Sequence, residues 1–480
     1  MVIPVLLMAA AALGAAEADH YRLVTLPVPQ GIRMEVSGLD RLPDGRIAAA
    51  TRNGDVWLAA NAYDEPPTEL RYHRFASGLH EPLGLAARDD ALYLMQRSEL
   101  TRLRDNDNDG VADEYKTIAK GWGVTGNYHE YAYGPKFNRD GSMWVTLNQS
   151  IGEKLTRDDK WRGWSLLVQP NGAWSPVSAG MRSPSGLGLN AEGDAFYTDQ
   201  QGNWVPTNSL HHMRRGAFHG HPDSLRDCDR PEATVKRPTE IPKGIPIAEA
   251  ARKIPGLLPA IWFPYRKMGM SATDVLLDDT GGRFGPFSGQ LFAGDFTLSL
   301  ITRVFLEKVD GEYQGACFPF REGFESAVVR MTWGKDGSMF VGMTNRGWNS
   351  LGTRSYGLQR VVFTGKAPFE AKSMESRADG FDVTFTGPAD ERTLRDPASW
   401  SMTSYTYLYH PTYGSPEIDA RALRIAKVES LDGGAKARLT VEGLRPGYVH
   451  ELKYSGVRSP AGGAPVHDVA YYTLNRIRGR

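Results

Sequence analysis

Histidine is the side chain best suited to acid–base chemistry near neutral pH, and its distribution along this chain is uneven. Four of the 11 histidines, His211, His212, His219 and His221, fall in the single segment LHHMRRGAFHGHP, and His129 lies in GNYHEYAYGP. A neutral imidazole can accept a proton from a hydroxyl group. These residues are therefore candidates for a general base, although His211 and His212, beside two arginines, also suit a solvated loop.

Two charged residues lie between these histidine segments. Arg182, in RSPSGLGLN, could bridge backbone carbonyls, or it could have the catalytic role that a resemblance to a known enzyme family implies for it. Asp199, in FYTDQQGN, could orient Arg182 or cap a turn. We predict His129, Arg182 and Asp199 as the catalytic residues, with a purely structural role as the alternative for each.

The segment DNDNDGVADE places acidic side chains at alternate positions, with Gly110 at the turn. Oxygen ligands at odd-numbered positions of a tight loop are typical of calcium sites. The twelfth position is Lys116, where an EF-hand has a glutamate, so Glu114 or a neighbouring loop would complete the coordination shell. A solvated acidic turn is the alternative, and a bound calcium ion would be structural. The predicted ligands are Asp105, Asp107, Asp109 and Asp113.

A repeated phrase predicts the elements that must position these residues. An apolar segment, an acidic residue followed in most copies by glycine, and an alternating segment together indicate a β-hairpin. Strong copies such as LDRLPDGRIAAAT and MTWGKDGSMFVGMT, with weaker ones, bring the count to six. Repetition at this scale predicts an all-β, six-bladed β-propeller over residues 19–365, in which distant loops converge at one mouth. The copies are centred on Asp44, Asp89, Asp140, Glu192, Gly289 and Asp336.

The two ends of the chain differ from this repeat. Residues 1–18 are apolar and end in small residues, which predicts a signal peptide cleaved near Ala16 or Ala18 and a periplasmic or secreted protein, with no membrane span after cleavage. Short alternating strands over residues 366–480 predict a small Ig-like β-sandwich. Its stretch SYTYLYHPTYGSPE could face carbohydrate, although alternating tyrosines more often pack within a sheet.

Charge and cysteine content bound the function further. The chain has 56 basic and 56 acidic side chains, so no global field attracts nucleic acid. The two cysteines, Cys228 and Cys317, could form one disulfide or remain two buried thiols.

The segments HEYAYGPKFNRDGSMWVTLNQ, RSPSGLGLNAEGDAFYTDQQGN and GAFHGHP resemble the soluble quinoprotein glucose and sorbosone dehydrogenases, six-bladed propellers that hold pyrroloquinoline quinone in the central mouth. The resemblance implies that His129 is the general base and that Arg182 and Ser183 contact quinone and substrate. It also implies that carbonyls of the Gln200–Gly202 loop help to hold a catalytic calcium ion. The cofactor-binding residues it suggests are Ser183, Gln200, Gln201, Gly202, His219, His221 and Arg346.

The chain departs from that family at the cations that neutralise the quinone carboxylates. The family has a lysine on the fifth blade, and this chain has Thr297 or its neighbours at that place. The family has paired arginines on the sixth blade, whereas this chain has only Arg330, at a shifted position. Either Arg346 and Arg354 compensate, or the cofactor is absent.

The segments LRDNDNDGVADEY, GAFHGHPDSL, MTNRGWNSLG and GLQRVVFTGKAPFE are similar to a group of exported propeller proteins described as membrane-bound dehydrogenases. That resemblance covers nearly the whole chain. Members commonly continue into a c-type cytochrome, but this sequence has no CxxCH motif, so electrons would pass to a separate acceptor such as a c-type cytochrome.

These observations predict an exported quinoprotein-like oxidoreductase that oxidises a hydroxyl group of a sugar or alcohol with pyrroloquinoline quinone and calcium. The substrate would be a sugar or a polysaccharide fragment. Two alternatives stay open: a propeller that binds carbohydrate or protein without redox chemistry, and a metal-assisted polysaccharide lyase or hydrolase.

Overall fold

The computed structural model describes residues 16–152 and 158–479. The predicted signal peptide, residues 1–18, therefore lies almost entirely outside the described residues. Strands dominate the described chain, which confirms the all-β class. Among these residues, no helix is long and apolar enough to cross a membrane.

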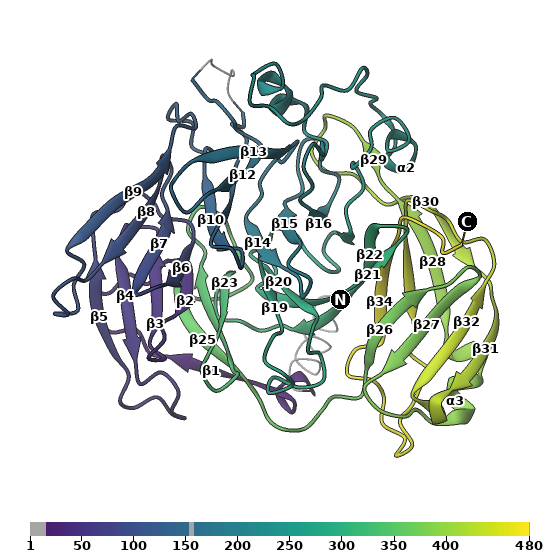
Figure 1. Cartoon of the computed structure of the whole chain (residues 1–480). Coiled ribbons are helices and arrows are strands. Elements are labelled where there is room, and N and C mark those ends of the chain that lie inside the picture. The colour runs from purple at the N-terminus through teal and green to yellow at the C-terminus, as the bar shows by residue number, and fades with distance from the viewer. Residues whose placement is uncertain (1–15, 153–157, 480) are drawn as a thin grey trace.

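Most strands belong to sheets of four that follow one another along the chain (Figure 1). The first three are β2 (Val36–Arg41), β3 (Ile47–Thr51), β4 (Val56–Ala60) and β5 (Arg71–Ala76); β6 (Leu85–Arg88), β7 (Ala91–Met95), β8 (Glu99–Arg104) and β9 (Glu114–Lys120); and β10 (Ala132–Phe137), β11 (Met143–Leu147), β12 (Trp164–Val168) and β13 (Trp174–Ala179). The next three groups are β14 (Gly186–Leu189), β15 (Ala195–Asp199), β16 (Asn208–His212) and β18 (Ile261–Phe263); β19 (Ala272–Leu277), β20 (Leu291–Asp295), β21 (Leu300–Val309) and β22 (Glu312–Arg321); and β23 (Val328–Trp333), β24 (Met339–Thr344), β25 (Tyr356–Phe363) and β1 (Tyr21–Leu26).

Five of the six repeated phrases form the first two strands of these groups, which confirms those hairpins, whereas the phrase near Gly289 covers only the second strand of its group, β20. Gly45 and Gly141 have φ angles of 94° and 87° in their turns, a region that glycine enters without steric cost. The connection between β19 and β20 is longer than a tight turn. Because turn and alternation are local signals, the sequence located the other five hairpins correctly.

The first strands of successive groups contact one another in a closed circuit, from β2 through β6, β10, β14, β19 and β23 back to β2. Glycines allow this close approach. A Cβ atom on Gly84 would lie 2.2 Å from the carbonyl oxygen of Gly134, and one on Gly186 would lie 2.0 Å from that of Thr273. The N-terminal strand β1 pairs with β25 and completes the last sheet, so both ends of the repeat region are joined.

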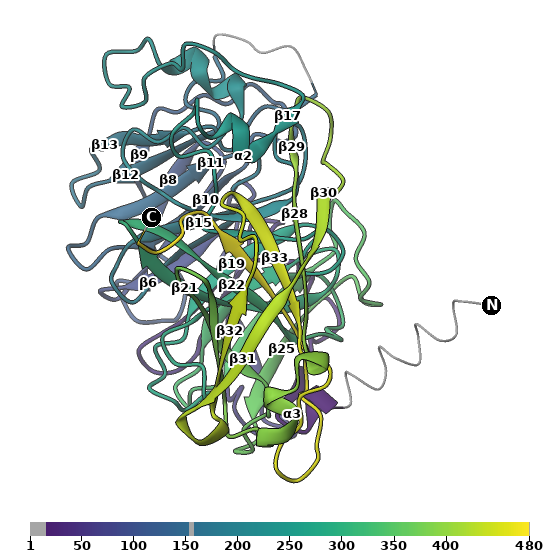
Figure 2. The ribbon, with the colours of Figure 1, turned by 90° about the vertical axis from the view of Figure 1, so that its right-hand side faces the viewer.

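The C-terminal unit is fused to this ring through a shared sheet. Strand β22 pairs with β34, so the fifth sheet of the ring continues into four C-terminal strands and becomes eight-stranded (Figures 1 and 2). A second sheet packs over it around a core that includes Phe381, Trp400 and Tyr472. The continuing strands are β34 (Val469–Leu474), β33 (Tyr448–Lys453), β28 (Ser401–Thr406) and β30 (Ile418–Leu423), and the second sheet is β26 (Ala371–Ser376), β27 (Gly380–Phe385), β32 (Lys436–Val441) and β31 (Ile425–Leu431).

Short elements complete the described chain. Strands β17 (Ile245–Pro246) and β29 (Leu408–Tyr409) pair with each other and so join the ring region to the C-terminal unit a second time. The helices are brief: α2 (Ile247–Ala250), α3 (Glu391–Arg395), and the 3₁₀ turns η1 (Pro222–Asp227), η2 (Pro397–Ser399) and η3 (Asp432–Gly434).

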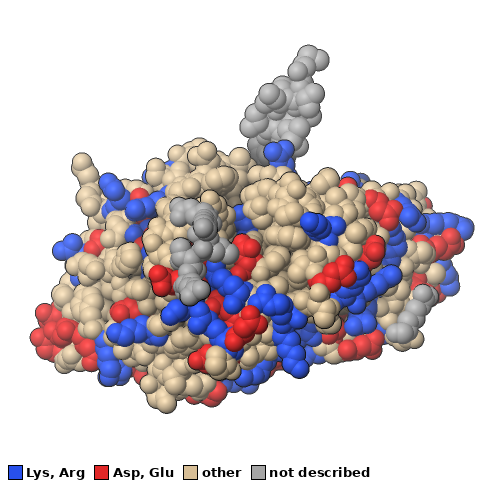
Figure 3. All heavy atoms as spheres, turned by 90° about the horizontal axis from the view of Figure 1, so that it is seen from above, with Lys and Arg blue, Asp and Glu red and all other residues tan. Residues whose placement is uncertain are grey.

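The surface charges and the two cysteines can both be compared with what the sequence predicts. Basic and acidic side chains are interspersed over the face seen in Figure 3, in line with the formal net charge of zero. Cys228 and Cys317 are both free thiols, the second fully buried on β22, so the disulfide alternative is wrong.

Candidate functional site

A cavity of about 300 Å³ lies at the common centre of the ring. Each group of strands contributes to its wall through a residue on or just before its first strand. Ligand pockets in proteins commonly begin at about this volume and collect polar groups from several elements. The wall residues from the six groups, in chain order, are Ser37, Leu83, Tyr133, Ser185, Thr273 and Val329.

His129 lies on the wall of this cavity, in the connection between β9 and β10. Its backbone N–H donates to Asn127 Oδ1 at 2.9 Å, and its half-buried ring meets the ring of Tyr128 edge-on at 5.4 Å between centroids. An imidazole held in a cavity by its own backbone can accept a proton from a bound hydroxyl group.

Arg182 lies on the same wall and is buried. Its Nε has no hydrogen-bond partner among the described residues. Burial lowers the pKa of this guanidinium, and the negative charge of Asp199 opposes that effect. A buried cation that lines a cavity and forms no ion pair with a described carboxylate is suited to an anionic ligand.

The chain packs closely around Arg182. A Cβ atom on Gly202 would lie 1.9 Å from Arg182 Nε, so glycine is required for the guanidinium to lie against this backbone. The Gly202 carbonyl accepts hydrogen bonds from the N–H groups of Gly414 at 3.0 Å and Val205 at 3.2 Å. Because both bonds use that oxygen, it is poorly placed to serve as a calcium ligand.

Asp199 lies outside the cavity and holds the backbone at Arg182 in place. Its carboxylate accepts hydrogen bonds from the backbone N–H groups of Arg182 at 2.9 Å, Ser183 at 2.7 Å and Gln200 at 3.0 Å. Burial raises its pKa to about 6. Asp199 does not line the cavity, so the geometry assigns it a positioning role and favours the orienting interpretation.

Three further arginines line the cavity. Arg52 pairs with Glu81, which also pairs with Arg97 at 2.6 Å, and Arg346 donates to Glu35 at 2.6 Å, so both arginines are engaged by carboxylates. Arg330 donates to the carbonyls of Val329 and Leu83 and forms no ion pair with any described carboxylate, although Asp274 acts on it at longer range.

Neither Arg52 nor Arg330 was among the site residues predicted from the sequence. A signal for Arg52 exists: TRNG and TNRG both follow the second strand of a repeat, and Arg346 of the second segment was predicted. Neither Arg354 nor Thr297 lines the cavity. Arg354 pairs with Glu325, and the Thr297 hydroxyl donates to Ser271.

The remaining predicted cofactor residues divide into two groups. Ser183, Gln200, Gln201 and Arg346 line the cavity with His129 and Arg182. His219 and His221 do not. His219 faces a separate cleft of about 720 Å³ that also contacts His211 and His212, whereas His221 is buried, its N–H bonded to the Gly180 carbonyl. Burial lowers the pKa of His221 to about 3 and that of His219 well below its ordinary value, so both are neutral.

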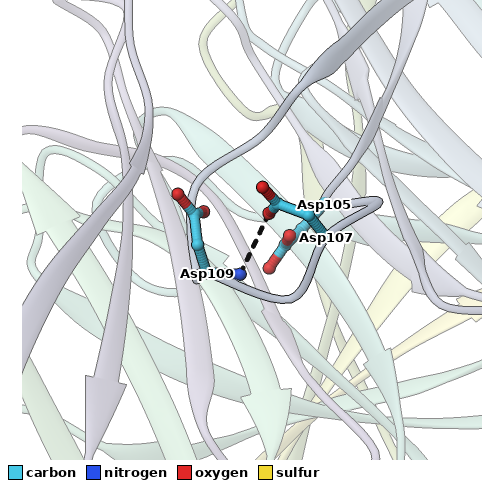
Figure 4. Close-up of side chains that lie close together, drawn as sticks. All are labelled: Asp105, Asp107 and Asp109. Carbon is cyan, nitrogen blue, oxygen red and sulfur yellow. Dashed lines mark hydrogen bonds between the residues drawn. The ribbon is translucent and has the colours of Figure 1, made fainter.

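The acidic loop lies between β8 and β9, and none of its residues lines the central cavity. Ligand oxygens of Asp105, Asp107 and Asp109 lie within 4.8 Å of one another (Figure 4). Asp113 instead accepts a hydrogen bond from the N–H of Asn106 at 2.7 Å and stands outside that group.

Residues 70–313 match a protein family described as a domain of unknown function, DUF7133, over just over half of the chain. The chain belongs to this family. The DUF7133 region contains His129, Arg182 and Asp199, whereas Arg330 and Arg346 lie beyond it. No curated protein matches the sequence.

Several solved structures are similar to this chain. A Thermus thermophilus protein described as an oxidoreductase (glucose dehydrogenase) is 19% identical, with a TM-score of 0.50, covering 71% of this chain and 100% of its own. A Trichoderma reesei protein of carbohydrate-active enzyme family AA12 is 12% identical, with a TM-score of 0.51 and coverages of 72% and 97%. The PQQ-bound aldose sugar dehydrogenase of Streptomyces coelicolor is 15% identical, with a TM-score of 0.49 and coverages of 71% and 98%. The first two show that this DUF7133 member has a β-propeller fold.

Proposed function

We propose that the central cavity is the active site of an oxidoreductase that oxidises a hydroxyl group of a sugar. The observation that carries this proposal is that His129 and Arg182, a buried arginine without an ion-pair partner among the described residues, line the same central cavity. A ring nitrogen of His129 would accept the hydroxyl proton, and the cavity would keep bulk water from the reacting carbon. The similar fold of a protein described as a glucose dehydrogenase supports the sugar as substrate.

The residues present fit pyrroloquinoline quinone, a planar cofactor with three carboxylates. Arg182 and Arg330 line the cavity, lack ion-pair partners among the described residues and would bind carboxylates. When bound, the quinone would supply the two-electron acceptor that protein side chains lack. Electrons would then pass to a separate acceptor such as a c-type cytochrome.

Reconstitution tests this function. Purified protein is incubated with pyrroloquinoline quinone and calcium, quinone uptake is followed by absorbance, and dye reduction is measured over a panel of sugars and alcohols. Uptake with substrate-dependent dye reduction supports the oxidoreductase. Protein that takes up no quinone refutes it and favours a carbohydrate-binding propeller or a lyase or hydrolase at the same cavity.

Replacing Arg182 by glutamine is expected to weaken quinone binding by about 10- to 100-fold, because one charge-assisted hydrogen bond to a carboxylate contributes about 1.5 to 3 kcal/mol. Equilibrium titration with the quinone measures the change. Arg354→Gln is the matched control, since Arg354 is exposed and paired with Glu325 outside the cavity. Equal affinities for the two variants would contradict the assigned role of Arg182.

We further propose that the acidic loop binds a structural calcium ion. Isothermal titration of chelator-treated protein with calcium is expected to show uptake that Asp107→Ala abolishes, because three carboxylates that converge within 4.8 Å repel one another unless a cation lies among them. Asp64→Ala, in another exposed loop, serves as the control. A flat titration of the unmodified protein would show that the loop is only a solvated turn.

We also propose how the chain divides into domains and that it is exported. The six groups of strands would be the blades of a six-bladed propeller over residues 19–365, and residues 366–480 would be an Ig-like sandwich. Export to the periplasm or beyond would follow cleavage of the signal peptide. Glu17 is buried and paired with Arg321 at 2.8 Å, so cleavage after Ala16 retains this contact and cleavage after Ala18 removes it.

A further inference from the structure

The rim of the central cavity gathers exposed aromatic side chains. In the described part of the chain, six large hydrophobic side chains are exposed, and three of these line this one cavity. They are Tyr128, Trp348 and Tyr413, with exposed fractions of 53%, 64% and 59%. Exposed apolar groups scattered singly need no explanation, but a cluster at the mouth of a cavity marks a place where a ligand binds.

Tyr413 comes from the C-terminal unit. Residues 410–416 connect β29 to β30 and lie against the propeller loop 202–206, so we name this segment the strap. Four hydrogen bonds fix the strap to that loop, which shows that the position of Tyr413 is built into the fold. They run from Gly414 N to Gly202 O at 3.0 Å, from Ser415 N to Pro206 O at 2.9 Å, from Trp204 N to His410 O at 3.1 Å, and from Asn203 Nδ2 to Pro411 O at 2.8 Å.

The strap brings Tyr413 beside the proposed catalytic residues. The guanidinium carbon of Arg182 lies 5.4 Å from the centroid of the Tyr413 ring, within the range of a cation–π contact. Arg182 is itself fixed by Asp199 and by the close approach of Gly202. The exposed part of the Tyr413 ring therefore borders the same wall as His129.

The cavity lining suits a neutral sugar. Arg52 and Arg346 are already engaged in ion pairs, with Glu81 and Glu35, no carboxylate of the described chain lines the cavity, and Arg182 and Arg330 are assigned to the cofactor. The other polar groups are mainly hydroxyls and amides, which bond to sugar hydroxyls as donors or acceptors. They include Ser37, Ser183, Ser271, Thr344, Gln200 and Gln201.

We propose that Tyr413, together with Tyr128 and Trp348, forms a subsite for the sugar unit next to the one that is oxidised, so that the substrate is a neutral oligosaccharide. The flat ring faces would stack on the apolar face of a pyranose ring. This inference rests on the proposed function, because that function places the reacting sugar beside His129. It gives the C-terminal unit a direct part in substrate recognition.

Binding of two ladders, malto- and cello-oligosaccharides of one to four units, tests the subsite by isothermal titration without quinone. Affinity for at least one ladder is expected to rise with chain length in the unmodified protein. Tyr413→Ala is expected to weaken binding of the longer members about tenfold and to remove the dependence on length, and Tyr413→Phe is expected to keep both, because the ring performs the stacking. Tyr115→Ala is the matched control, since Tyr115 is also exposed but lies on β9, outside the cavity.

The outcomes separate the subsite from the oxidoreductase. Affinity that is independent of chain length, no binding by either ladder, or equal behaviour of Tyr413→Ala and Tyr115→Ala would overturn the subsite. The dye-reduction assay with monosaccharides remains the test of the redox function. Length-dependent binding without dye reduction would therefore support the subsite and refute the oxidoreductase.

Discussion

Replacing His129 by alanine is expected to lower the rate of sugar oxidation in the reconstituted protein by about 10²- to 10⁴-fold, the usual contribution of a positioned general base. The imidazole lies on the cavity wall that also presents Arg182, and no other described histidine lines this cavity. Without this imidazole, no other histidine and no carboxylate of the described residues lines the cavity to accept the hydroxyl proton. Steady-state dye reduction at saturating sugar measures the change in kcat.

Two controls make this prediction specific. Quinone uptake by His129→Ala, followed by absorbance, separates the loss of a base from the loss of the cofactor. His73→Ala removes an exposed imidazole from β5, outside the cavity. A His129→Ala variant that binds quinone and turns over as fast as His73→Ala would eliminate His129 as the base.

The free energy of unfolding is expected to decrease by about 3 kcal/mol as the pH rises from about 6.5 to about 9, because a buried ionic network loses its proton. His467 Nδ1 lies 2.7 Å from Glu370 Oε2 and its Nε2 lies 3.0 Å from Glu17 Oε1. Arg321 pairs with the other oxygen of Glu17 at 2.8 Å, and all four side chains are buried.

The direction of this effect follows from the pKa of His467. Burial alone would lower that pKa, but the carboxylates of Glu370 and Glu17 outweigh burial and raise it to about 9. Since the folded value lies above that of the unfolded chain, the stabilisation is complete below about pH 6.5 and is lost as the pH passes through 9.

Denaturant unfolding of the unmodified protein and of His467→Gln at pH 6, 7.5 and 9.5 measures this dependence. The variant is expected to lose about 3 to 5 kcal/mol at pH 6, where it leaves buried carboxylates with one cation fewer, and the difference should shrink at pH 9.5. His73→Gln is the control for loss of an exposed histidine. A difference that stays constant with pH would show that His467 acts only by packing.

The hairpins were predictable because their signals are local. An acidic residue and glycine set the turn, and alternation of side chains sets the two strands, so the segments near Asp44 and Asp336 needed no tertiary information. The position of a loop within the repeat also predicted that His129 faces the central mouth, and the family resemblance predicted the same of Arg182; both line the cavity.

Sequence patterns misplaced residues whose neighbours come from elsewhere in the fold. His219 and His221 were predicted to contact the cofactor, but His219 lines a separate cleft and His221 is buried outside the cavity. The tyrosine-rich stretch divides in the same way: Tyr405, Tyr407 and Tyr409 are buried, whereas Tyr413 reaches the cavity.

By itself, the sequence determined the all-β class and five of the six predicted hairpins, since these depend on turns and on the alternation of side chains. Only the tertiary structure decided that Arg52 and Arg330 join the cavity, that Asp199 supports it from behind, and that a strap from the C-terminal unit reaches its rim. The physical reason is that ion pairing, burial and strand pairing between distant segments, such as β22 with β34, are set by packing across the whole molecule and leave no local pattern.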